Sequence, residues 1–333
     1  SVNELFEIEL AFLEYKELST DTILEKTAYI KTIDGKPSKH FSLYSKNNEN
    51  LLDARNKQTT PYSENGQYAT GYATHGLFPY RGKFHPQLIK ALINIIGLNK
   101  GDLLLDPMCG SGTANIEASL MSIDSYGIDI SPFCQFMTEV KYEALTVDIE
   151  MLKIIDQKTE KLFEFFNRKN ALVRIGELED SKRKVYRLAL LAFLDSWGYS
   201  LRVVKSNHEQ LFCKVLKRYI ETVLTIANNQ YFDKNGIGLV RILSSSEALN
   251  IKLEDNSVDG VITSPPYSFA IDYAENDRPQ LEFLGYDVNE LKSKMIGLKG
   301  KTKQDKLDKY FEDMKKVCLE IYKVLKAGKF FVM

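Results

Sequence analysis

The sequence predicts an α/β fold of the doubly wound kind that carries an all-helical insertion. Two apolar runs that end at Asp106 and Asp129 enclose a glycine-containing turn and a helical pattern, which is the order of a βαβ unit with parallel strands. Between residues 149 and 235 only helical patterns occur. Strand-like apolar runs return at residues 238–243, 257–263 and 329–333. In this prediction a helical block therefore interrupts a parallel sheet.

With 333 residues the chain is long enough to bury the core of one large domain with an insertion, or of two domains. Its 44 Lys and Arg residues nearly balance 45 Asp and Glu residues, so no overall positive charge indicates nucleic-acid binding. Any basic surface must be local.

The cysteines are scattered without the spacing of a metal site, so we expect neither zinc nor a disulfide framework. The first residues lack the basic start and long apolar run of a signal peptide. The longest apolar stretch, residues 188–194, is too short to span a bilayer. We therefore expect an intracellular, cytoplasmic protein with no membrane partner.

The chain before the first strand combines helical and loop patterns. Residues 1–35 predict a helix followed by irregular chain, and residues 36–76 are rich in the polar residues of a linker. A helix is expected over residues 85–98, where Pro86 suits the first helical position and apolar residues follow at helical spacing. Much later, the lysine-rich run 299–306 is typical of an exposed loop.

The glycine-containing turn reads Asp106-Pro107-Met108-Cys109-Gly110-Ser111-Gly112. Because Gly110 and Gly112 lack Cβ atoms, the backbone can turn sharply and approach a ligand there, with amide groups of the next helix facing it. Asp129 ends the second strand about 20 residues later, where a carboxylate can accept both hydroxyls of a ribose. The pattern predicts a nucleotide-like cofactor. NAD in a dehydrogenase is the alternative, although the turn is not GxGxxG.

A second motif, Thr263-Ser264-Pro265-Pro266-Tyr267, follows a later strand. The two prolines lack amide hydrogens and have fixed φ, so they form a stiff corner with outward-facing carbonyls at a ligand-binding edge of the sheet. The motif resembles that of enzymes that methylate exocyclic amines, and an amine that donates to the Ser264 side chain and the Pro265 carbonyl would become pyramidal and able to attack a sulfonium methyl. Tyr267 would stack on a base extruded from a duplex. The alternative is a strand-ending turn with a packed aromatic ring.

Together these motifs resemble the S-adenosylmethionine-dependent amino-methyltransferases that modify exocyclic amines of bases in DNA. Residues 106–113 are similar to the family's Asp-Pro-Phe-Cys-Gly-Ser-Gly-Thr motif, with Met108 in place of Phe. Residues 76–86 resemble the motif that precedes it, and residues 246–249 and 255–259 resemble the segment leading into the catalytic strand. The resemblance implies S-adenosyl-L-methionine as the cofactor and a Rossmann-like methyltransferase sheet in a prokaryotic-type enzyme.

The resemblance also assigns roles to individual residues. The expected cofactor-binding residues are Lys83, Phe84, Asp106, Pro107, Met108, Gly110, Gly112, Asp129, Ile130 and Glu247. The expected catalytic residues are Ser264, Pro265, Pro266 and Tyr267, with no metal ion. The residues expected to border the substrate pocket are Phe269, Asp272, Tyr273 and Arg278. Phe78 and Tyr80 would either face the cofactor or pack under the sheet.

Four segments follow from these assignments. We expect an N-terminal helix and polar linker over residues 1–76, the cofactor-binding half over 77–148, the helical insertion over 149–235 and the catalytic half over 236–333. The family's sheet has more strands than the chain provides. Its C-terminal strands are therefore expected to be missing, to be supplied by a further C-terminal segment or by a partner chain.

The acceptor is expected to be DNA. In this resemblance a Ser before the prolines is associated mostly with cytosine, so we expect direct methyl transfer to the N4 amine of a flipped cytosine by a site-specific enzyme. Adenine N6 is the alternative, followed by an RNA base, and by a catalytically silent DNA-binding or assembly subunit. A cognate restriction nuclease, in a restriction-modification system, is the expected partner besides DNA.

The helical insertion is the candidate for target recognition. Residues 150–235 contain 16 Lys and Arg against 11 Asp and Glu, a net charge of +5. Local positive charge of this kind suits phosphate contacts. The insertion would equally serve as a packing or dimerisation element.

Overall fold

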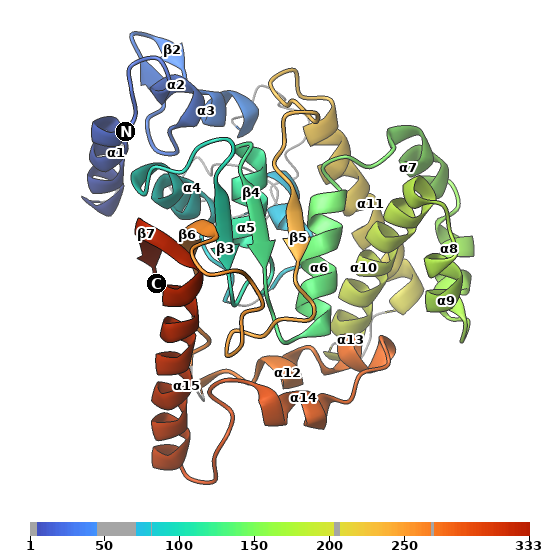
Figure 1. The fold of residues 1–333 in the computed structure, drawn as a ribbon. Coiled ribbons are helices and arrows are strands. Elements are labelled where there is room, and N and C mark those ends of the chain that lie inside the picture. Colours follow the sequence, from blue (N-terminus) through green and yellow to red (C-terminus); the bar gives the residue numbers. More distant parts are fainter. Residues whose placement is uncertain (1–4, 45–70, 81, 203–206, 268–269) are drawn as a thin grey trace.

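The computed structural model describes residues 5–44, 71–80, 82–202, 207–267 and 270–333 (Figure 1). Its centre is a sheet with the strand order β5-β4-β3-β6-β7, in which all neighbours are parallel. The strands are β3 (Leu103–Asp106), β4 (Asp124–Gly127), β5 (Val240–Ile242), β6 (Val258–Ile262) and β7 (Leu325–Val332). The predicted doubly wound α/β fold with a helical insertion is confirmed.

The predicted βαβ unit consists of β3, a helix and β4. The helices of this part are α4 (Pro86–Ile95), α5 (Thr113–Leu120) and α6 (Pro132–Glu143). Helix α5 connects β3 to β4, whose register places Leu103 opposite Asp124 and Asp106 opposite Gly127. Helix α6 begins after Ser131, whose hydroxyl accepts a hydrogen bond from the Cys134 amide at 3.4 Å.

Helices cover both faces of the central strands. Successive strand residues point to opposite faces, so Leu104 packs with α4 and α5, whereas Leu105 packs with α15 (Lys303–Val324). In β6, Ile262 and Val261 divide between the two faces in the same way. The sheet continues from β3 to β4 on one side and to β6 on the other. The carboxyl ends of β3 and β6 therefore form the crevice at which open α/β sheets bind ligands.

The insertion is entirely helical within the described residues. Its helices are α7 (Ile149–Asp156), α8 (Thr159–Phe166), α9 (Ala171–Gly176), α10 (Asp180–Arg202) and α11 (His208–Ala227). Residues 149–168, whose spacing predicts one continuous helix, form two helices. The chain breaks at Gln157 and Lys158, and the Thr159 hydroxyl donates to the Asp156 carbonyl at 2.8 Å, in place of an intrahelical partner.

The core of the insertion is shared with the chain that follows the proline corner. That chain forms α12 (Tyr273–Asn276), α13 (Arg278–Phe283) and α14 (Val288–Lys294). The rings of Phe193 in α10 and Phe283 in α13 lie 5.3 Å apart. The buried Gln280 donates to the Leu194 carbonyl at 3.0 Å. The insertion thus packs against a wall of the cavity described below.

The N-terminal part contains more regular structure than the sequence predicts. Its elements are α1 (Leu5–Glu17), α2 (Ile23–Lys26), β1 (Thr32–Ile33), β2 (Lys36–Pro37), α3 (Lys39–Tyr44) and the 3-10 helix η2 (Ala73–Gly76). Buried Glu14 accepts hydrogen bonds from the Ala28 amide and from Asn94, which ties α1 to α4. Helix α3 and η2 lie in the expected linker, of which residues 45–70 are outside the described residues.

Helix α15 begins inside the run 299–306, where the sequence indicated a loop. The Thr302 hydroxyl accepts from the Asp305 amide at 3.1 Å and caps this helix. Among the helices in the described parts of the chain, none is both long and apolar enough to cross a membrane.

Candidate cofactor and substrate site

A cavity of about 1060 Å³, counting the part open to solvent, lies where β3, β4 and β6 end. It brings together most residues that the two sequence motifs nominated. The nominated residues that line it are Lys83, Phe84, Pro107, Met108, Gly110, Asp129, Ile130, Glu247, Ser264, Pro265, Pro266 and Tyr267. Asp106 and Gly112 do not line the cavity. They support the turn from below.

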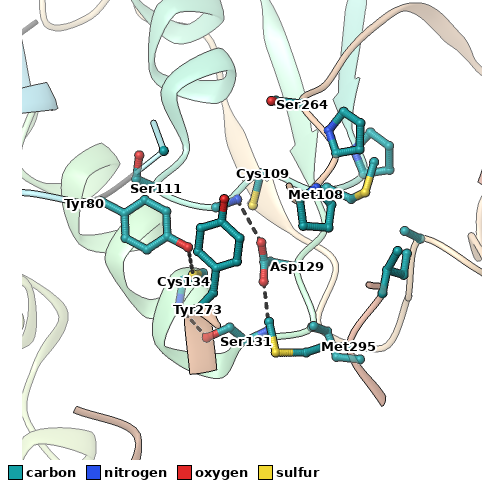
Figure 2. Close-up of a pocket in the computed structure, with 18 of the residues that line it drawn as sticks. Tyr80, Met108, Cys109, Ser111, Asp129, Ser131, Cys134, Ser264, Tyr273 and Met295 are labelled. Atoms are coloured by element: carbon teal, nitrogen blue, oxygen red, sulfur yellow. Dashed lines mark hydrogen bonds between the residues drawn. The ribbon is translucent and has the colours of Figure 1, made fainter. Parts of the chain in front are cut away.

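Asp129 connects the end of β4 to the glycine turn. One carboxylate oxygen accepts from the Gly110 amide at 2.8 Å and the other from the Ser131 amide at 2.8 Å (Figure 2). Burial raises the pKa of Asp129 to about 6, although both amide hydrogen bonds oppose this shift. Each oxygen has a second lone pair, so a carboxylate in this position can also accept ribose hydroxyls.

The turn itself requires glycine. Gly110 has φ +50° and Gly112 has φ +75°, the left-handed region that disfavours other residues. A Cβ atom at Gly112 would also lie 2.4 Å from the Cγ2 atom of Thr138. At Gly112 the close approach is to Thr138 of helix α6. Gly110, in contrast, lines the cavity.

Asp106 joins the two motifs. Its Oδ1 atom accepts from the Thr263 hydroxyl at 2.7 Å and from the Met108 amide at 3.2 Å, and the Asp106 side chain is fully buried. Burial raises the pKa of Asp106 to about 7. Because Thr263 directly precedes Ser264, this hydrogen bond fixes the proline corner relative to the glycine turn.

Among the described residues, Lys83 is one of two lysines that line the cavity, and Lys294 is the other. Its Nζ atom donates to the His75 carbonyl at 3.1 Å, and burial lowers the pKa of Lys83 to about 8. A partly buried ammonium in such a cavity suits a carboxylate ligand. Glu247 lies exposed on the rim and pairs through its backbone with Asn250.

The proline corner begins one residue after β6. The Thr263 amide bonds to the Val332 carbonyl of β7 at 3.1 Å, and Ser264, Pro265 and Pro266 are half-buried along the cavity wall. Tyr267 is 60% exposed. A ring this exposed is not the packed aromatic of the alternative interpretation, and it is available for stacking.

Tyr80 and Tyr273 add an aromatic pair to the cavity. Their ring centroids lie 6.4 Å apart at an interplanar angle of 20° (Figure 2). The Cys134 thiol donates to the Tyr80 hydroxyl at 3.5 Å, and burial raises the pKa of Tyr80, which keeps it neutral. A Cβ atom at Gly82 would lie 3.1 Å from the Tyr273 hydroxyl. Tyr80 therefore faces the site, whereas Phe78 packs on Phe133.

The other residues expected at the substrate border lie elsewhere. Asp272 caps α12 by accepting from the Glu275 amide, and it also pairs with Lys292 at 2.9 Å. Arg278 pairs with Glu275 at 2.7 Å. Neither lines the cavity. Both are engaged in ion pairs within the α12–α14 segment. Phe269 is outside the described residues.

Sequence reasoning missed a part of the wall. Met295 and Ile296, which follow α14, line the cavity, and so does Cys134 of α6. No motif marks Met295 or Ile296. They enter the site only because α14 folds back over the ends of the strands, which local sequence does not reveal.

The side chains that line the cavity fit S-adenosylmethionine. Lys83 offers a cation for a carboxylate, Asp129 an acceptor for a ribose, and Met108 and Ile130 apolar surface for a purine. Burial raises the pKa values of the Cys109 and Cys134 thiols, so neither is a ready nucleophile. In the described residues, no group of three or more His, Cys, Asp or Glu side chains could hold a metal ion.

The chain is similar to known methyltransferases. Residues 77–185 match the family model described as the RMKL-like methyltransferase domain, UPF0020. These residues include the glycine turn and Asp129. The match and the relatives below support an S-adenosylmethionine-dependent methyltransferase.

Type II methyltransferase M.BsoBI of Geobacillus stearothermophilus is 27% identical over 303 residues, which cover 72% of this chain and 59% of that one. Type II methyltransferase M.MjaII of Methanocaldococcus jannaschii is 46% identical over 81 residues, 24% of this chain and 15% of that one. The tRNA (guanine(10)-N2)-dimethyltransferase of Methanothermobacter thermautotrophicus is 43% identical over 53 residues, 16% of each chain. The matches thus cover less than two thirds of the length of each of these relatives.

Proposed function

We propose that this chain transfers a methyl group from S-adenosylmethionine to the exocyclic N4 amine of a cytosine in DNA. The observation that carries the proposal is that residues of the glycine turn, Asp129, Ser264, Pro265, Pro266 and Tyr267 line one cavity. The similarity to two Type II methyltransferases supports DNA as the substrate. Site-specific methylation beside a partner nuclease belongs to the same proposal.

The chain's own residues would bind and orient the cofactor, which supplies an electrophilic sulfonium methyl. Lys83 would pair with its carboxylate, and Asp129 would accept from its ribose hydroxyls. Met108 and Ile130 would cover its apolar parts. Glu247, on the rim, would contact the adenine side.

The proline corner would prepare the acceptor. The Ser264 hydroxyl and the Pro265 carbonyl accept hydrogen bonds from the two N–H groups of the amine, which localises the nitrogen lone pair. That lone pair would form the new N–C bond while the C–S bonding electrons stay on sulfur, and the nitrogen would then release one proton to water. Most of the rate would come from in-line alignment.

A base must leave the duplex to reach this cavity. Tyr267 is exposed beside the proline corner and would stack on the flipped base. Such stacking contributes roughly 1–3 kcal/mol, which offsets part of the cost of unstacking.

The decisive experiment identifies the product. The chain is incubated with methyl-labelled S-adenosylmethionine and mixed-sequence DNA, and the digested nucleosides are resolved by mass spectrometry. Labelled N4-methylcytosine is the expected product, and Ser264→Ala is expected to lose most of it. Labelled N6-methyladenine alone would show that adenine, and not cytosine, is the acceptor. The absence of any label would contradict methyl transfer to DNA.

An RNA base is the second candidate acceptor, because a short segment is similar to a tRNA dimethyltransferase. The same assay with total tRNA separates the two acceptors. Label in tRNA but not in DNA would favour this candidate.

A further inference from the structure

Helix α6 presents two buried donors to the underside of the glycine turn. The Thr138 hydroxyl donates to the Gly110 carbonyl at 3.2 Å, and the Lys141 Nζ atom donates to the Ser111 carbonyl at 3.3 Å. Both side chains are almost completely inaccessible to solvent, with 0% and 1% of their surface exposed. Neither lines the cavity. They lie one helical turn apart, so one face of α6 binds two successive carbonyls.

Lys141 is otherwise hard to explain. Burying an ammonium group costs several kcal/mol even after relaxation, so packing alone does not favour a lysine at this position. Burial lowers its pKa well below the usual range, with Lys83 adding to the effect. Charged or neutral, Lys141 keeps N–H donors, and the Ser111 carbonyl is the acceptor they meet.

These two contacts fix the orientation of the amide groups that follow each carbonyl. In a trans peptide the N–H points opposite to the C=O. Holding the Gly110 carbonyl against Thr138 therefore turns the Ser111 amide away from α6, the side on which Gly110 and Ser111 line the cavity. Holding the Ser111 carbonyl against Lys141 turns the Gly112 amide toward the Cys109 carbonyl, to which it bonds at 2.8 Å.

We propose that Thr138 and Lys141 are positioning residues for the cofactor. By holding two carbonyls of the turn against α6, they keep the Ser111 amide directed at the ligand and the turn closed. The absence of a Cβ at Gly112 is what lets the turn reach Thr138. The inference rests on the proposed function for the identity of the ligand, but not for the geometry of the turn.

The test separates the hydroxyl of Thr138 from its volume. Thr138→Val keeps the shape and removes the donor, whereas Thr138→Ser keeps the donor. Loss of a hydrogen bond to a buried acceptor is expected to raise the Kd for S-adenosylmethionine roughly 5- to 100-fold in Thr138→Val, with near wild-type Kd in Thr138→Ser. Lys141→Met, which keeps the length and removes the donors, is expected to weaken binding similarly. Titration calorimetry measures all four proteins.

Thr222→Val is the matched control, because the Thr222 hydroxyl donates to the Arg218 carbonyl at 2.8 Å on α11, away from the cavity. It is expected to leave the Kd unchanged. Wild-type affinity in Thr138→Val, or equal losses in the Val and Ser variants, would overturn the proposal.

A second readout does not depend on the ligand. Amide hydrogen exchange at Gly112 is expected to accelerate in Thr138→Val and Lys141→Met, but not in Thr138→Ser or Thr222→Val. If the wild-type chain binds no S-adenosylmethionine, the proposed function fails, and the exchange data alone decide the positioning role. Unchanged exchange at Gly112 in both donor-free variants would then contradict it.

Discussion

Asp129 and Tyr267 are expected to act in different steps of the proposed reaction. Asp129 is bound to the backbone of the turn and faces the expected ribose, whereas Tyr267 stands exposed beside the proline corner. One side chain is fixed before any ligand arrives, and the other contributes only when a base arrives. Substitutions at the two positions should therefore affect different steps.

Asp129→Ala is expected chiefly to raise the Kd for S-adenosylmethionine, by roughly tenfold or more, because an acceptor for two hydroxyls and the tether of the Gly110 amide are both lost. Tyr267→Ala is expected to lower methyl transfer at saturating cofactor while leaving that Kd near the wild-type value. Calorimetry and single-turnover transfer measure the two effects. Equal losses of both quantities in both variants would count against these roles.

Cofactor affinity is expected to depend on pH through Asp129 and Lys83. The pKa of Asp129 is raised to about 6 and that of Lys83 is lowered to about 8 by burial. Asp129 is the better acceptor when charged, so binding should weaken as the pH falls through 6. Lys83 pairs with a carboxylate only when protonated, so binding should also weaken as the pH rises through 8.

Titration of the Kd from pH 5 to pH 9.5 checks this dependence. Lys83→Met is the control, since it should remove most of the alkaline weakening and leave the acidic limb. The cofactor's own amino group titrates identically in both proteins, so the difference between them isolates Lys83. An unchanged alkaline limb in Lys83→Met would contradict the assignment.

At the scale of elements, the site depends on how β3 and β6 end. The hydrogen bond from Thr263 to Asp106 crosses between these strands beneath the cavity. The glycine turn begins at one end of this contact and the proline corner at the other. Their separation therefore sets the distance between methyl donor and acceptor.

Thr263→Val is expected to lower the transfer rate roughly tenfold or more, because loss of the bond lets the corner shift relative to the turn. The Kd for the cofactor should change much less, since Thr263 does not line the cavity. Thr263→Ser should restore the rate. A rate unaffected in Thr263→Val would show that the two motifs keep their alignment without this bond.

Much of this arrangement was predictable from local sequence. The glycine turn, Asp129 and the proline corner each follow an apolar strand, and parallel strands end at one edge of a sheet. Met295 and Ile296 carry no such signal, because they reach the cavity through the packing of α14. The start of α15 did carry a local signal. Thr302 and Asp305 form an N-cap pattern, although the surrounding lysines are typical of an exposed loop.

At the scale of the whole molecule, the edge of the sheet that holds the cavity carries buried acidic groups. The folded-state pKa of Asp106 is raised to about 7 from a usual value near 3.8. The folded state therefore holds a proton more tightly than the unfolded chain does. The stability that this proton contributes is present at low pH and is lost as the pH rises through 7.

Asp106→Asn is expected to raise the Tm of the apo protein at pH 8, by a few degrees or more, because a neutral amide replaces a buried carboxylate. The difference from the wild type should be smaller at pH 5, where Asp106 is protonated in the folded protein and ionises only in the unfolded chain. Calorimetric scans at the two pH values measure it. A difference that is the same at both pH values would indicate that folding does not raise the pKa of Asp106.

The bond between Asp106 and Thr263 has one more consequence, which concerns the order in which the chain becomes functional. The two residues are 157 positions apart, and the whole helical insertion lies between them. Closing so long a loop carries an entropic cost that local contacts do not repay. A nascent chain that ends before β6 lacks the acceptor corner and also the strand that pairs with β3. The complete site would therefore form only once synthesis has passed Thr263.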